Sequence, residues 1–158
     1  KNRQARPGGS MLSEADKRTI VQKLELIDYL YQRHGQAILD DVGRLESGRM
    51  HAIWVDIKSG ANGPEDLLNV LWRDMGGEMG MAWTERRDEA GWLRLRCTSC
   101  PFADLARAHG YAAAGYALFC AGDHGIVSGF NPELEFSRST TLMAGDDCCD
   151  HAYRLRGG

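Results

Sequence analysis

The sequence predicts an α+β domain in which N-terminal helices precede an antiparallel sheet of about four strands, in the order β-β-α-α-β-β, with helices packed on one face. Two patterns support this fold class. In the first half of the chain, apolar residues recur at spacings of three and four, as on one face of a helix. In the second half, two pairs of short segments alternate between apolar and polar residues, as in half-buried strands. The length of 158 residues suits a single domain at 11–158, preceded by a flexible arm at 1–10.

Three segments have the pattern of helices before the predicted sheet begins. Ser13 is a good N-cap, and the apolar residues that follow it keep helical spacing through residues 20–31, as far as Gly35. The same period continues through residues 36–45, so Gly35 either separates two helices or kinks one. A third, short helix is expected at residues 65–75, after a loop rich in Gly, Asn and Pro.

The remaining elements form the predicted sheet and two helices between its strand pairs. The first two strands are separated only by Asp88-Glu89-Ala90, which is typical of a hairpin. In chain order we expect strands at 79–87 and 91–97, helices at 101–109 and 112–127, and strands at 134–141 and 148–156.

The charge balance excludes several classes of partner. Nineteen Lys and Arg residues against 22 Asp and Glu residues give a net charge of −3, spread along the chain, which excludes a nucleic-acid groove or a patch for anionic membranes. The longest uncharged stretch, residues 110–122, is shorter than the roughly 20 residues of a membrane helix, and no signal segment opens the chain. Five cysteines, an odd number, indicate reduced thiols. We therefore expect a cytoplasmic protein with a small-molecule partner.

The final predicted strand carries a thiol and an imidazole on the same face. Residues two apart in a strand share a face, so Cys149, His151 and Tyr153 are expected on the covered side of the sheet, away from Cys148. A thiol close to an imidazole can be held as a thiolate, the form that acts as a nucleophile. The alternative is structural: Cys149 is a small core residue, and His151 is a hydrogen-bonded core histidine.

An acidic residue interrupts the apolar stripe of the helix expected at 112–127. Tyr116, Cys120 and Asp123 follow one another at helical spacing. A buried carboxylate without a partner is unfavourable, so Asp123 is expected to face a pocket, a cation or an imidazole. Alternatively, Asp123 bonds to a turn because the helix ends at Gly125.

Other candidate side chains lie in a cysteine pair and in two turns. Cys97 and Cys100 have the spacing of half a zinc site, but the sequence lacks a second pair of this kind. Cys100 precedes Pro101 at the start of a helix, where the helix dipole lowers a thiol pKa; alternatively it is a core thiol. Asn131 and Asp146 lie in turns, and each is expected first to shape its turn and second to contact a ligand.

Several of these residues recur in the motifs of a known family. The segments are Cys100-Pro101, Phe119-Cys120-x-x-Asp123, Gly129-Phe130-Asn131-Pro132, Leu142 and residues 145–151. Together they resemble the L-2-amino-thiazoline-4-carboxylic acid hydrolase family, whose Phe-Cys-x-x-Asp motif falls on Cys120 and Asp123, and whose Gly-Asp-x-x-Cys motif falls on Gly145, Asp146 and Cys149. The resemblance implies a bacterial α+β protein that hydrolytically opens a five-membered ring containing sulfur and nitrogen, giving an N-carbamoyl-cysteine product. A looser likeness is to vinyl-reductase-type domains that bind small ligands.

We therefore expect a cysteine-dependent hydrolase that opens a small cyclic C–N or C–S substrate, either a thiazoline, a cyclic amidine or an amide. Cys149 attacks as a thiolate, His151 transfers protons, and Asp123 orients His151 or holds a cationic nitrogen of the substrate. No cofactor is expected for this chemistry. The expected catalytic residues are Cys149, His151, Asp123 and Cys120, and the expected substrate-binding residues are Asn131, Asp146, Tyr116 and Phe130.

Two other functions fit the same residues. In the first, the four expected catalytic side chains hold a zinc ion that activates water. In the second, the protein is a non-enzymatic module that binds a small ligand, with Arg94, Arg96 or Arg138 pairing with a ligand carboxylate; otherwise these arginines are simply exposed. The sequence does not indicate an oligomeric state.

Overall fold

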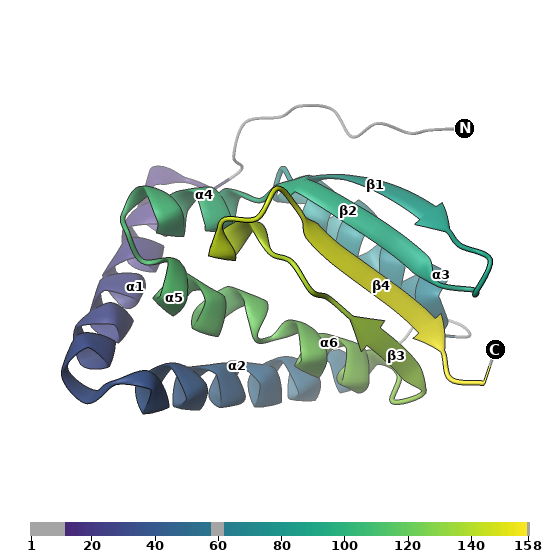
Figure 1. Cartoon of the computed structure of the whole chain (residues 1–158), viewed down its shortest axis with the longest axis horizontal. Helices are drawn as coiled ribbons and strands as arrows, with labels where there is room; N and C mark the ends of the chain where they lie inside the picture. The colour runs from purple at the N-terminus through teal and green to yellow at the C-terminus, as the bar shows by residue number, and fades with distance from the viewer. Residues whose placement is uncertain (1–11, 58–61, 158) are drawn as a thin grey trace.

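The computed structural model describes residues 12–57 and 62–157. Within them, a sheet lies on one side of the molecule, and helices cover one of its faces and extend beyond it (Figure 1). The strands are β1 (Ala82–Arg87), β2 (Leu93–Ser99), β3 (Leu134–Ser137) and β4 (Cys149–Leu155). They lie in the order β1-β2-β4-β3, and every pairing is antiparallel. The predicted α+β class is confirmed, while the predicted arm at 1–10 lies outside the described residues.

The N-terminal half begins with two long helices, α1 (Glu14–His34) and α2 (Gln36–Asp56). Ser13 caps α1 in a reciprocal capping box with Asp16, and Gly35, with φ of 79°, separates the two helices. The helix predicted at 36–45 continues to Asp56 because its apolar face resumes beyond a polar turn and places Trp54 in the core. Among the helices that the structure describes, none is long and apolar enough to span a membrane.

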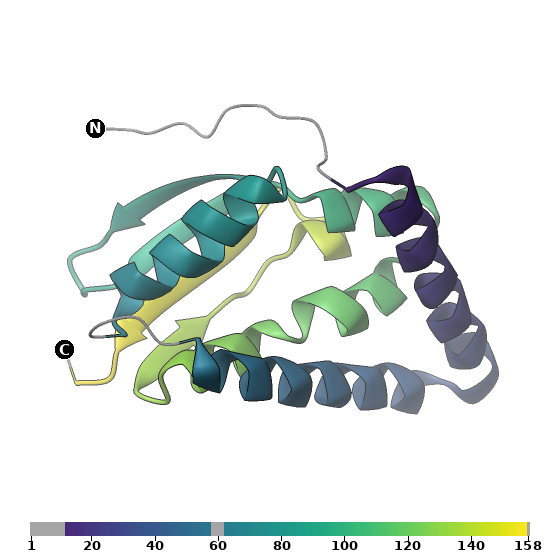
Figure 2. The same ribbon diagram turned by 180° about the vertical axis from the view of Figure 1, so that it is seen from behind.

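A helical segment lies across the covered face of the sheet (Figure 2). It consists of α3 (Pro64–Leu67) and the π-helical segment η1 (Leu68–Gly76), close to the helix predicted at 65–75. Its buried side chains include Leu67, Leu68 and Trp72, which pack in the same cluster as the inward residues of β2 and β4.

The segment predicted as one helix at 112–127 is divided. Its parts are α5 (Ala112–Gly115), the π-helical turn η2 (Tyr116–Cys120) and α6 (Asp123–Phe130). In η2 the Ala121 N–H bonds to the carbonyl of Tyr116, five residues earlier, at 3.0 Å. A π-helical turn inserts one residue, which rotates the following residues about the axis. Asp123 begins the new helix α6 that follows this turn.

Two glycines allow α6 to lie against α2. A Cβ atom on Gly125 would be 1.9 Å from the Ser47 carbonyl oxygen, and one on Gly129 would be 2.5 Å from the His51 carbonyl oxygen. Only a residue without a side chain permits this approach. The helix accordingly passes through Gly125 and does not end there, so the proposed turn role of Asp123 is wrong.

The inward face of β4 follows the predicted alternation. Cys149, His151 and Tyr153 are buried on the covered face, whereas Leu155 at the strand end is 41% exposed. The neighbouring strand β3 ends at Ser137, four residues earlier than predicted. It ends early because the chain then turns its N–H groups to the Asp150 carboxylate instead of to another strand.

The buried side chains form two clusters. The first joins the sheet to η1, α2 and α6. The second joins α1, α5 and α4 (Pro101–Ala108) to the short turn η3 (Leu142–Ala144), with Leu24 and Met143 at its centre. Cys100 and Leu142 pack against both clusters. The seam between them is where the predicted cysteine site lies.

Candidate active site

Cys149 occupies the first position of β4, at the seam between the two clusters. Its sulfur accepts a hydrogen bond from the Leu142 N–H at 3.3 Å. Its direct partner on β2 is Cys97, whose thiol donates to the Ser99 carbonyl at 3.3 Å. Hydrogen bonding with the Cys97 thiol is the main reason why the pKa of Cys149 falls from 9.0 to about 6, and it outweighs burial, which acts in the opposite direction. The Leu142 N–H and the electrostatic influence of His151 and Arg138 lower the pKa further.

The other thiols around Cys149 remain protonated. The hydrogen bond to Cys149, followed by burial, raises the pKa of Cys97. Burial raises the pKa of Cys100 and of Cys120, and the nearby Asp123 raises that of Cys120 further. Among these thiols, the surroundings favour the thiolate form at Cys149 and the protonated form at Cys97, Cys100 and Cys120.

The loop before β4 is shaped to present the Leu142 N–H to the sulfur. The Thr141 hydroxyl caps η3 by accepting from the Ala144 N–H at 3.1 Å. The Asp146 carboxylate accepts the Thr141 N–H at 2.7 Å, and Gly145, with φ of 100°, makes the turn between them. The structure thus gives Asp146 the first of its two expected roles, that of shaping the turn.

His151 lies two residues further along β4, on the same face as Cys149. Its Nε2 atom is 3.1 Å from an Asp123 carboxylate oxygen. Its ring packs edge-on against Trp72 at 4.9 Å and is stacked with Phe136 at 5.7 Å. Its Nδ1 atom is buried and has no hydrogen-bond partner among the described residues. Because Asp123 orients Nε2, Nδ1 is the ring nitrogen left to exchange a proton with another group.

Arg138 holds Asp123 in place from the other side. Its guanidinium donates to the same carboxylate oxygen of Asp123, to the Cys120 carbonyl at 3.2 Å and to the Tyr116 hydroxyl at 3.0 Å. The guanidinium also lies over the rings of Tyr116 and Phe136. Burial alone would lower the pKa of Arg138, but the charge of Asp123 raises it. Arg138 was expected to pair with a ligand carboxylate, but in the structure it pairs with the carboxylate of Asp123.

The structure thus links most of the predicted catalytic residues. Asp123 contacts His151 directly, and Arg138 joins it to Cys120 and Tyr116, which is 42% exposed. Cys149 lies on the same strand face as His151, but among the described residues its sulfur has no hydrogen bond to that imidazole or to the other members of this group. Cys149 is only 9% exposed, so its thiol lies just below the surface.

Two predicted substrate-binding residues have other contacts. Phe130 is fully buried, and its ring meets Trp54 edge-on at 6.0 Å, so it is part of the core and not of a ligand surface. The Asn131 amide donates to the Asn62 carbonyl at 3.0 Å, and its oxygen accepts the Glu133 N–H at 2.9 Å. Asn131 thus stabilises its turn, which was the first of its two expected roles.

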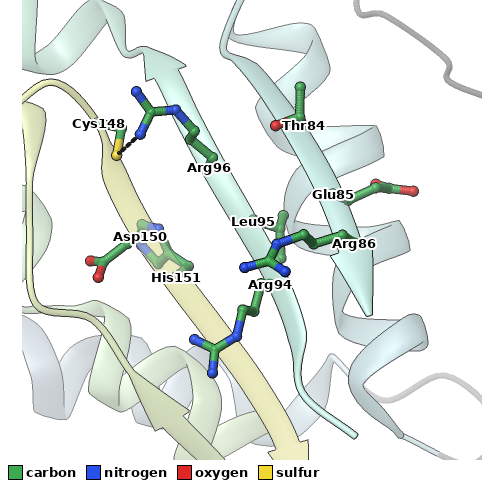
Figure 3. A pocket seen from close by; sticks show the side chains of 9 residues that line it. All are labelled: Thr84, Glu85, Arg86, Arg94, Leu95, Arg96, Cys148, Asp150 and His151. Atoms are coloured by element: carbon green, nitrogen blue, oxygen red, sulfur yellow. Dashed lines mark hydrogen bonds between the residues drawn. The ribbon is translucent and has the colours of Figure 1, made fainter. Parts of the chain in front are cut away.

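The opposite face of the sheet carries a hollow of about 430 Å³, where the arginines of β1 and β2 gather (Figure 3). There, Arg96 donates to the Cys148 sulfur at 2.8 Å, and Arg94 donates to Asp88 at 2.5 Å. Cys148 therefore lies away from Cys149, as the strand alternation predicted. Both arginines already have partners within the chain.

The zinc alternatives gain no support from this geometry. Within residues 12–57 and 62–157, no three His, Cys, Asp or Glu side chains are arranged so that they could hold a metal ion. Tetrahedral zinc needs three or four such ligands. Neither the pair Cys97 and Cys100 nor the four expected catalytic side chains form such a set.

Sequence reasoning missed the residues that tune the thiol. Cys97 drew attention only for its spacing to Cys100, whereas its contact is with Cys149 on the adjacent strand. The Leu142 N–H is a backbone donor and leaves no mark in the residue type. Trp72, which supports the His151 ring, lies in a segment that carried only a helical pattern.

A family model described as L-2-amino-thiazoline-4-carboxylic acid hydrolase matches residues 17–153. No curated protein and no solved structure matches the chain. The matched range runs from the first turn of α1 into β4, and so includes the helix that carries Asp123 and the strand that carries Cys149 and His151.

Proposed function

The chain belongs to the L-2-amino-thiazoline-4-carboxylic acid hydrolase family, and we propose on that premise that it opens a small ring by cysteine-dependent hydrolysis. The observation that supports this proposal is the environment of the Cys149 sulfur. Hydrogen bonding with the Leu142 N–H and the Cys97 thiol and the nearby charge of Arg138 favour its thiolate, and an imidazole held by a carboxylate lies on the same strand face. A thiolate beside an oriented imidazole is the arrangement of cysteine-dependent acyl transfer.

In the proposed reaction, the Cys149 sulfur forms a bond to the ring carbon that lies between nitrogen and sulfur. The electron pair of the C=N bond moves to the ring nitrogen, which takes a proton from His151. The ring C–S bond of this tetrahedral adduct then breaks, which leaves the carbon as a planar isothiouronium centre bound to Cys149, and water attacks that carbon while His151 accepts one of its protons. Departure of the Cys149 thiolate then forms the C=O bond of the opened product, and the proton of the added hydroxyl passes to the freed ring sulfur.

Asp123 serves as a positioning residue in this scheme. Its carboxylate is shared between His151 and Arg138, so it orients the imidazole and does not need to hold the substrate. It also stabilises the imidazolium that forms when His151 accepts a proton. Cys120, whose pKa is raised, forms part of the wall of the site as a neutral thiol.

The test compares two adjacent cysteines that face opposite sides of the sheet. Ring opening of 2-amino-thiazoline-4-carboxylate releases a thiol, which a thiol-reactive dye detects. Cys149→Ala is expected to abolish thiol release, whereas Cys148→Ala is expected to retain it, and thermal melting checks that both variants fold. Turnover by Cys149→Ala at the wild-type rate would show that the nucleophile is assigned wrongly. Stabilisation of the wild-type protein by the compound without its consumption would favour a binding module instead.

A further inference from the structure

Cys97 and Cys149 are a directly opposed pair in the sheet. They pair in the β2–β4 register, and both side chains are buried on the covered face. Opposed residues of antiparallel strands have Cα atoms about 4.5 or 5.5 Å apart, depending on the type of pair. Disulfides join Cα atoms that are roughly 4.4–6.8 Å apart. Either type of pair therefore has a Cα separation within the range that a disulfide spans, and each thiol is the largest influence on the pKa of the other.

We infer that Cys97 and Cys149 form an oxidation site, in which a hydroperoxide oxidises Cys149 and Cys97 then closes a cross-strand disulfide. This inference goes beyond the proposed hydrolysis, since it needs no ring substrate. Cys97 then has two roles: it favours the thiolate of Cys149 in the reduced protein, and it forms the disulfide after Cys149 is oxidised.

The two steps balance with one peroxide molecule. The Cys149 thiolate attacks the terminal peroxide oxygen, the O–O bond breaks, and the sulfur becomes a sulfenic acid while the departing oxygen takes a proton. The Cys97 sulfur then attacks the Cys149 sulfur, forming the S–S bond and releasing the sulfenic oxygen as water with the proton of the Cys97 thiol. Two thiols are oxidised by two electrons, and the peroxide is reduced to water or to water and an alcohol.

Oxidation of Cys149 also prepares Cys97 for the second step. In the reduced protein, the hydrogen bond to the negative Cys149 sulfur is the main cause that keeps Cys97 protonated. A sulfenic acid is neutral, so this effect disappears once Cys149 is oxidised. Loss of the Cys97 proton becomes easier at the stage at which its sulfur acts as the nucleophile.

The remaining thiols provide matched controls. Cys148 points to the other face of the sheet, where Arg96 contacts its sulfur. Cys100 lies beyond the end of β2, before the first residue of α4, and has no partner position on β4. Cross-strand opposition therefore distinguishes Cys97 from both.

The experiment treats the full chain with hydrogen peroxide, blocks the remaining thiols and maps cross-linked peptides by mass spectrometry without reductant. We expect an intact mass lower by two hydrogens, one cross-link between the peptides of Cys97 and Cys149, and recovery of both thiols with dithiothreitol. In Cys97→Ser the cross-link is lost, and a Cys149 sulfenic acid is trapped by dimedone. Cys100→Ser and Cys148→Ser retain the cross-link of the wild-type chain.

Oxidation of Cys149 to sulfinic acid in the wild-type chain without a cross-link would overturn the inference. So would a cross-link from Cys149 to Cys100, or a chain whose five thiols all resist the peroxide. None of these readouts involves turnover, so the proposed function fails separately. If Cys149→Ala still opened the ring while the wild-type chain formed the disulfide, the hydrolytic assignment would fall and the oxidation site would stand.

Discussion

Replacing Cys97 with alanine removes the donor that most lowers the pKa of Cys149. A hydrogen bond to a charged group contributes about 1.5–3 kcal/mol, and about 1.4 kcal/mol corresponds to one pKa unit. Loss of this bond should therefore raise the pKa of Cys149 from about 6 to between about 7 and 8, still below its ordinary value of 9.0 because the Leu142 N–H and the electrostatic influence of His151 and Arg138 remain. Cys97→Ser, whose hydroxyl can also donate, should show a smaller increase.

The assay is the rate of Cys149 alkylation by iodoacetamide as a function of pH, followed by peptide mass spectrometry. The midpoint of this profile reports the pKa of the thiol. Cys100→Ala is the control, since Cys100 is also a buried thiol but is not among the groups that lower the pKa of Cys149. An alkylation midpoint that stays near 6 in folded Cys97→Ala protein would refute the role of the Cys97 hydrogen bond.

Three further predictions concern the support of the site. Asp123→Asn leaves a buried guanidinium without its counter-ion and His151 without its carboxylate, so it should cost about 3–5 kcal/mol of unfolding free energy in urea and should lower kcat more than it raises KM. Gly125→Ala should lower the free energy of unfolding by about 1–3 kcal/mol or more, because its Cβ would overlap α2. Gly48→Ala, with open space around it, should raise the melting temperature. Equal melting temperatures of the two variants would contradict the packing argument. Ring opening should increase as the pH rises through about 6, because deprotonation of Cys149 creates the nucleophile. A rate that falls over this range would contradict a thiolate mechanism.

Local patterns were sufficient to predict the fold class and the inward face of β4. The alternation correctly predicts that Cys149, His151 and Tyr153 are buried on the covered face, because the side-chain period of a strand does not depend on its neighbours, whereas Ala152 on the other face is buried as well. The capping of α1 by Ser13 is equally local. The π-helical turn before Asp123 is different, since an inserted residue leaves no compositional mark, and the helix was therefore predicted as continuous.

The contacts that tune the site depend on pairings between distant segments. Cys97 and Cys149 are opposed because of the register of two strands that are not consecutive in the chain, which periodicity alone cannot specify. The same holds for Arg138, which was considered as a partner for a ligand and instead pairs with Asp123. The sequence indicated that Asp123 required a partner but did not distinguish an imidazole from a cation. In the structure Asp123 contacts both, His151 and Arg138.

The seam between the two apolar clusters divides the support of the thiol into a fixed part and an adjustable part. The Cys97 donor belongs to a strand hydrogen-bonded directly to β4, so it travels with the sulfur. The Leu142 N–H belongs to a turn that packs against both clusters. A small displacement of one cluster relative to the other would therefore change the distance from this N–H to the Cys149 sulfur, while the hydrogen bonds between the strands stay intact. A change in the relative placement of the two clusters would in this way alter the pKa of the thiol without unfolding of either cluster.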